Sequence, residues 1–128
     1  MSSSVGEPRV GTASPSEGAT FRRLTAPEHF RLAYREGARV TDGLLIVYAR
    51  PNKLAVRRLG IVVPARVGSA VRRNRLKRRL REASRMAAAL LPSGTDVVVV
   101  GRPPAGEAPF AALQDSVRAL FNRAAGAR

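Results

Sequence analysis

The stretch "LGIVVPARVGSAVRRNRLKRRLREASRMAAALLPSGTDVVVVG", residues 59–101, contains three segments with different patterns of apolar residues. The first, which ends at Pro64, is rich in β-branched residues and predicts a strand. The second has apolar residues at helical spacing until Pro92 and Gly94 interrupt it, which predicts a long helix. Four consecutive valines follow and predict a strand that is buried on both faces. The stretch therefore predicts a strand, a helix and a central strand in succession.

The predicted helix has two opposite faces of different character. Its apolar stripe, at steps of four, three, four and three residues, consists of Leu76, Leu80, Ala83, Ala87 and Leu90. Its polar face consists of Asn74, Lys77, Arg78, Arg81 and Arg85. The only acidic residue between positions 71 and 82 is Glu82, so the i to i+4 ion pairs of an ordinary surface helix are missing. This uncompensated charge predicts a contact with a phosphate backbone.

The segment before this stretch predicts a short helix and two strands. Residues 25–37 have Thr25 and Glu28 at the spacing of a capping box and Gly37 at the position of a terminator. Residues 44–48 and 54–63 are strand-like, and the short turn between them favours an antiparallel pair.

The order of predicted elements is helix, strand, strand, strand, helix, strand and helix, the last helix opening at Pro109. Such a mixture predicts an α+β fold, a two-layer sandwich of one sheet covered by helices. Residues 1–20 are rich in Ser, Gly and Pro and predict a disordered tail. We therefore expect one RNA-binding domain at 21–124 and a short C-terminal tail at 125–128.

The composition indicates the class of partner and the cellular location of the protein. The chain has 23 basic and 9 acidic residues, a formal net charge of +14, which favours nucleic acid over an anionic membrane as partner. It has no cysteine, no apolar signal segment and no apolar run long enough to span a membrane. We expect a soluble, cytoplasmic protein.

The sequence offers no set of residues for protein-based catalysis. His29 is the only histidine, and no acidic pair, nucleophile elbow or phosphate-binding glycine loop accompanies it. We therefore expect no catalytic residue and no protein metal site.

The segment "VGSAVRRNRLKRRLRE", Val67–Glu82, resembles the signature of the bacterial ribonuclease P protein subunit, with Arg73, Asn74 and Arg75 as its central triplet. The flanking segments "RLTAPEHFRLAYREGARV" and "DVVVVGRPPA" are also similar to that family, so that the resemblance covers residues 23–122. One departure is visible, since Ala65 and Arg66 replace the usual pair of lysines.

The resemblance implies a function, partners and a fold detail. The protein would be an accessory subunit in a 1:1 complex with ribonuclease P RNA and would also bind precursor tRNA. The RNA would carry out endonucleolytic removal of the 5′ leader, with magnesium held through the RNA and no cofactor bound by dedicated protein ligands. The family also implies a left-handed βαβ crossover.

The resemblance assigns two groups of site residues. The expected RNA-binding residues are Arg66, Arg72, Arg73, Asn74, Arg75, Lys77, Arg78 and Arg81. The expected cleft for the single-stranded leader is formed by Phe30, Tyr34, Tyr48 and Val63. Aromatic faces stack on any base, so such a cleft suits leaders of varied sequence. Without the resemblance, paired aromatics on a helix are interpreted as core residues.

Three other readings compete with this one. A structural, ribosomal-protein-like RNA-binding protein without a role in processing needs the basic helix but no aromatic cleft. A nuclease that acts alone needs the acidic or histidine clusters that the sequence lacks. A membrane-surface protein needs large aromatic side chains opposite the cationic face, and these are also absent.

Overall fold

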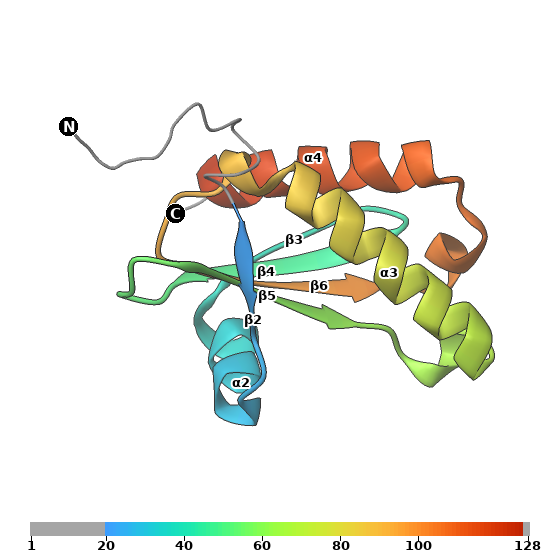
Figure 1. Ribbon diagram of the computed structural model, residues 1–128, viewed down its shortest axis with the longest axis horizontal. Coiled ribbons are helices and arrows are strands. Elements are labelled where there is room, and N and C mark those ends of the chain that lie inside the picture. Colours follow the sequence, from blue (N-terminus) through green and yellow to red (C-terminus); the bar gives the residue numbers. More distant parts are fainter. Residues whose placement is uncertain (1–19, 127–128) are drawn as a thin grey trace.

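The computed structural model describes residues 20–126, which form one five-stranded sheet and three α-helices (Figure 1). The predicted order of elements and the α+β fold are confirmed, with one short strand, β2 (Phe21–Arg23), added before the first helix. The expected disordered tail falls almost wholly outside the described residues. The last helix, α4 (Phe110–Gly126), extends past the boundary that we expected at residue 124.

The valine strand β6 (Thr95–Gly101) lies at the centre of the sheet, as predicted. The strand order is β2-β5-β6-β4-β3, in which β6 is parallel to β5 (Arg57–Val62) and antiparallel to β4 (Leu45–Pro51). Val97, Val98 and Val99 have no exposed surface. A strand covered on both faces gains no advantage from polar alternation, which explains the uninterrupted valine run.

The predicted pairing of β4 with β5 is wrong. Strand β6 lies between them, and β4 pairs instead with β3 (Ala38–Thr41) on its other side. The two strands do run in opposite directions, but the turn at residues 52–56 spans one intervening strand. The local sequence of a short turn does not determine which distant strand occupies that space.

One face of the sheet packs against α3 (Ala70–Met86) and α4 and forms the main core (Figure 1). The predicted stripe of α3 is buried at Leu76, Leu80 and Ala83, while Ala87 and Leu90 continue it in the turn that follows. From α4, the buried residues are Leu113, Ser116, Val117, Leu120, Phe121 and Ala124. The amphipathic pattern of α3 therefore fixes which side of that helix faces outward.

Part of the opposite face is covered by α2 (Pro27–Glu36). The predicted capping box at Thr25 and Glu28 is wrong, because the N-cap residue is Ala26 and no side chain caps the helix. Thr25 lies one residue too early, and Pro27 begins the helix without needing a hydrogen bond for its nitrogen. Gly37 ends the helix, as predicted, and donates its N–H to the carbonyl of Ala33.

Helix α3 connects the neighbouring parallel strands β5 and β6 and so forms the crossover of a βαβ unit. Its left-handedness, implied by the resemblance, stays a prediction.

Candidate nucleic-acid interface

Residues of the signature segment itself, Gly68–Arg73, form the hydrogen bonds and the turn at the start of α3. Gly68 has a φ of 151°, which glycine adopts without steric cost, and a Cβ there would lie 3.0 Å from Cδ of Arg72. The hydroxyl of Ser69 accepts a hydrogen bond from the backbone N–H of Arg72, and Nε of Arg73 donates to the carbonyl of Gly68 at 3.2 Å. Arg73 is half-buried, so part of its hydrogen-bonding capacity fixes the helix start.

The expected RNA-binding residues of α3 lie on different sides of the helix. Asn74 and Arg78 are exposed, whereas Lys77 and Arg81 line a groove beside strand β2. On the other side, Arg72 and Arg75 line a small recess next to the 3-10 helix at Pro103–Glu107. The last expected residue, Arg66, is exposed in the turn before α3.

The neighbouring Arg79, which was not among the expected residues, also faces that recess. Its Nη1 donates to the carbonyl of Ala108 at 3.3 Å, and the side chain is half-buried. Arg79 therefore connects α3 to the segment before α4.

Most cations of this set have no acidic partner. Arg72 lies 3.5 Å from Glu107, but no ion pair within residues 20–126 involves the other expected cations, which are Arg66, Arg73, Arg75, Lys77, Arg78 and Arg81. The positive potential of this helix is thus largely uncompensated within the described chain, which favours an external polyanion.

Three of the four expected cleft residues lie together on the α2 side of the sheet. The rings of Tyr34 and Tyr48 pack edge to face with their centroids 4.9 Å apart. Phe30 packs with Leu24 and lies over Gly60 of β5. Tyr34 is 43% exposed, so its ring is available to a base. Burial and the neighbouring Tyr48 raise the pKa of Tyr34, which keeps its phenol protonated.

The fourth expected residue, Val63, does not join them. It is buried in the main core on the α3 side, close to Leu76 and Leu80. Successive residues of a strand point to opposite faces, so Val62 is the residue of this pair that packs beside Phe30 and Tyr48. The aromatic face, as we call it from here on, therefore consists of Phe30, Tyr34, Tyr48 and Val62.

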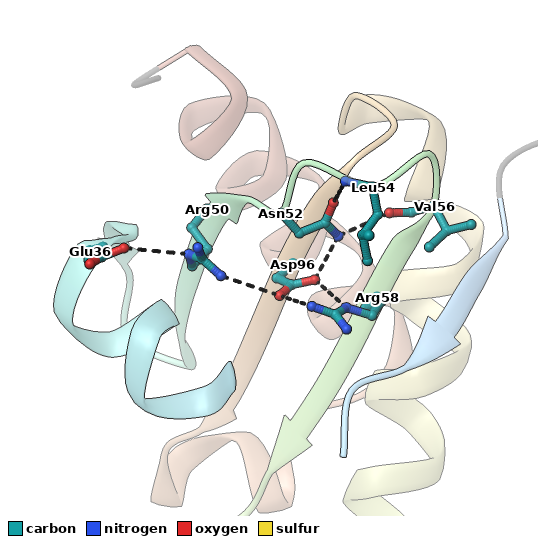
Figure 2. Close-up of polar contacts among 7 residues, drawn as sticks. All are labelled: Glu36, Arg50, Asn52, Leu54, Val56, Arg58 and Asp96. Carbon is teal, nitrogen blue, oxygen red and sulfur yellow. Dashed lines mark hydrogen bonds and ion pairs between the residues drawn. The ribbon is translucent and has the colours of Figure 1, made fainter. Parts of the chain in front are cut away.

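A charge network centred on the buried Asp96 joins strands β4, β5 and β6 to helix α2 (Figure 2). The side chain of Asp96 is fully buried and accepts two hydrogen bonds from Arg58, at 2.7 and 2.8 Å, and one from Asn52 at 2.8 Å. Arg50 lies 3.7 Å from Asp96 and 3.8 Å from Glu36 of α2. Sequence reasoning missed this network, although a lone aspartate before four valines signals a partner.

The network also changes the acidity of its central carboxyl group. Burial alone would raise the pKa of Asp96, but the hydrogen bonds from Arg58 and Asn52 and the charges of Arg58 and Arg50 outweigh burial and lower it. Asp96 is therefore ionised at neutral pH and joins three strands and, through Arg50, helix α2.

The described residues contain neither a metal-binding cluster nor a membrane-spanning helix. Within the described part of the chain, no three histidine, cysteine or acidic side chains are placed to hold a metal ion. None of the helices between residues 20 and 126 has the length and apolarity needed to cross a membrane.

The fold and these surfaces define a class: a small, strongly basic α+β protein with a cationic crossover helix and a separate aromatic sheet face. A family model described as Ribonuclease P matches residues 19–125. The chain belongs to the ribonuclease P protein family.

Individual relatives agree with the family model. The chain is 44% identical over 103 residues to the ribonuclease P protein component of Chloroflexus aurantiacus, which covers 80% of this chain and 76% of that protein. It is 41% identical over 116 residues to the component of Streptomyces avermitilis, with 84% and 94% of the two chains covered.

Solved structures of this family have the same fold. The RNase P protein from Thermotoga maritima matches with a TM-score of 0.72 and 33% identity, covering 80% of this chain and 96% of that chain. The Staphylococcus aureus RNase P protein matches with a TM-score of 0.73 and 30% identity, covering 80% and 94%. The function of this family is processing of the tRNA 5′ end together with an RNA subunit, and this chain shares it.

Proposed function

We propose that the chain is the accessory protein subunit of a ribonuclease P whose RNA performs the cleavage, and that it binds both that RNA and the 5′ leader of precursor tRNA. The observation that carries the proposal is the outward charge of α3, of which only Arg72 and Arg85 have acidic partners among residues 20–126, in a chain of this family. The expected RNA-binding residues form the surface for the catalytic RNA, and the aromatic face forms the surface for the 5′ leader.

Helix α3 would contact the catalytic RNA through its exposed side chains. Guanidinium groups such as Arg78 donate in a fork that suits phosphate oxygens, and Asn74 adds a short polar contact beside it. Neutralising phosphates near the cleavage site would let magnesium ions and substrate approach at a lower bulk metal concentration. The magnesium ions would be held through the RNA, and we infer a 1:1 complex in the cytoplasm.

The aromatic face would bind the leader. Exposed or half-exposed rings of Tyr34, Phe30 and Tyr48 present surfaces on which unpaired bases stack. Each stacked base contributes about 1–3 kcal/mol and requires no particular sequence. A protein with this face would distinguish precursor tRNA from mature tRNA, because only the precursor has a leader.

The test of the subunit role is cleavage of precursor tRNA by the cognate catalytic RNA at low magnesium, with and without the full-length protein. We expect the protein to raise the cleavage rate at low magnesium and to matter less as magnesium increases. If the rate at low magnesium does not change, the proposal is wrong.

The test of leader binding is the affinity of the assembled RNA–protein complex for precursor and mature tRNA. Phe30→Ala should weaken binding of precursor tRNA by roughly tenfold, the loss of about one stacked base, and leave mature tRNA unchanged. Equal losses for the two substrates would assign Phe30 to the core alone.

A further inference from the structure

A groove of about 590 Å³ lies between strand β2 and helix α3, at the edge of the sheet. Arg22 and Arg23 of β2 line one side of it, and Lys77, Arg81 and Arg85 of α3 line the other. Among residues 20–126, no acidic side chain lines the groove. Its size is within the usual range for ligand sites, so it suits a few nucleotides of a single strand rather than a duplex.

The cations on both sides have few partners. Arg85 forms an ion pair with Glu82 at 2.5 Å, but no ion pair within residues 20–126 involves Arg22, Arg23, Lys77 or Arg81. Like charges on facing sides of a groove repel each other, and an anion between them removes that repulsion. The groove is thus suited to a phosphate-bearing chain.

The inner wall of the groove is a strand edge. β2 pairs with β5 only at Arg57–Leu59, and the next residues, Gly60 and Ile61, line the groove without a strand partner on that side among the described residues. Backbone groups of successive strand residues alternate in direction, and those of Leu59 face β2, so the groups of Ile61 point to this open side and can hydrogen bond to phosphates or sugars.

Phe30 joins the groove to the aromatic face. Its ring lies over Gly60, it belongs to the apolar cluster that contains Tyr48, and it also lines the groove. A strand whose bases stack on the aromatic face can therefore continue past Phe30 into the groove without leaving the protein.

We propose that this groove binds the backbone phosphates of the 5′ leader beyond the nucleotides that stack on the aromatic face, with Arg22 and Arg23 as contact residues. The inference rests on the proposed leader binding and adds a second site for the same strand. The exposed side of α3 outside the groove, which carries Asn74 and Arg78, remains the surface for the catalytic RNA, whereas the groove, with Lys77 and Arg81, takes the single strand.

The test uses the complex of the full-length chain with its cognate RNA and precursor tRNAs with leaders of increasing length. In the variant Arg22→Gln/Arg23→Gln, the negative slope of log affinity against log salt should become shallower by about 1.4, because each contact with a single-strand phosphate contributes about 0.7. The decrease should appear only for leaders long enough to reach past Phe30. Mature tRNA and the shortest leaders should bind unchanged.

A matched control removes the same charge elsewhere. Arg118→Gln/Arg123→Gln changes two exposed arginines of α4, which lie outside the groove, and should leave every slope unchanged. The groove variant should fold normally, because Phe21, whose ring packs on Phe121, and the buried Leu24 are retained. Equal thermal unfolding midpoints would verify this.

Two results would overturn the inference: no change of slope at any leader length, or an equal change for mature tRNA or for the catalytic RNA alone. The second result would assign the groove to the interface with the catalytic RNA. A wild-type complex that does not prefer precursor over mature tRNA would instead refute leader binding itself, before any groove variant is compared.

Discussion

The ring of Phe30 lies against the backbone of Gly60 so closely that a Cβ at residue 60 would be 2.5 Å from Cε1 of Phe30. Real Cβ atoms do not approach other atoms this closely, so any side chain at position 60 displaces the ring. Gly60 thus fixes where Phe30 lies, between the aromatic face and the groove beside β2. Position 60 needs glycine for close approach and not for an unusual backbone angle.

Gly60→Ala should therefore weaken leader binding without touching any charged residue. We expect the preference of the RNA–protein complex for precursor over mature tRNA to decrease by up to about tenfold, the value of one lost base stack. The measurement is the ratio of the two affinities. Gly43→Ala is the control, because no atom lies within 4 Å of a Cβ at that exposed turn position. If Gly60→Ala leaves the preference for precursor over mature tRNA unchanged, leader binding does not depend on the position of Phe30.

Arg78 and Arg79 are adjacent on α3 but should behave differently. Arg78 is exposed and lies outside the groove, and Arg78→Ala should make the negative slope of log RNA affinity against log salt shallower by about one unit, for one lost phosphate contact. Arg79→Ala should leave the slope unchanged and lower the thermal unfolding midpoint, because Arg79 donates to Ala108 within the protein. Titrations of catalytic RNA at several salt concentrations would decide this. Equal slopes for both variants would contradict the split.

Val63 and Val62 provide a test of the corrected aromatic face. Val63→Ala should lower the free energy of unfolding by about 2 kcal/mol, because it leaves a cavity in the main core, but should not change the preference for precursor tRNA. Val62→Ala should decrease the preference for precursor tRNA and should lower the free energy of unfolding by less than Val63→Ala does. Denaturant unfolding and the two tRNA affinities would be measured together. A loss of leader preference in Val63→Ala alone would restore the original assignment.

Most of the fold could be predicted from local patterns. The buried valine strand, the apolar stripe of α3 and the terminator Gly37 follow from periodicity and backbone preferences, which depend on neighbouring residues only. The resemblance assigned residues to both surfaces, but the position of each side chain on α3 required the packed structure.

Apart from the capping box at Thr25 and Glu28, the errors concern relationships across the sheet. The separation of β4 from β5 depends on where β6 inserts, and the side on which Val63 lies changes with a shift of one residue in strand register. In the network, Asp96 lies 44 positions after Asn52 and 38 positions after Arg58 in the chain. No local pattern specifies partners at such distances. Only the isolated charge before the valines indicated that partners were needed.

The Asp96 network should stabilise the fold. Asp96→Asn removes the charge that pairs with Arg58 in a fully buried position, and we expect the free energy of unfolding at pH 7 to decrease by about 3 kcal/mol. Asp115→Asn is the control, because its ion pair with Arg118 is exposed and contributes less than about 1 kcal/mol. Urea unfolding of the three proteins would measure both effects.

The same substitution should change the response to acid. The folded state lowers the pKa of Asp96, so the unfolded state binds more protons in acid and stability increases with pH. The contribution of Asp96 is complete above its unfolded pKa, near pH 4, and is lost as the pH falls through the lower, folded pKa. Asp96→Asn should therefore flatten the decline of stability below about pH 4. Part of the decline should persist, because the pKa of Asp42 is also lowered. Burial acts to raise the pKa of Asp42, but the hydrogen bonds from Ser116 and from the backbone outweigh burial. If the free energy of unfolding of wild type and of Asp96→Asn declines in parallel below about pH 4, protonation of Asp96 does not contribute to acid unfolding.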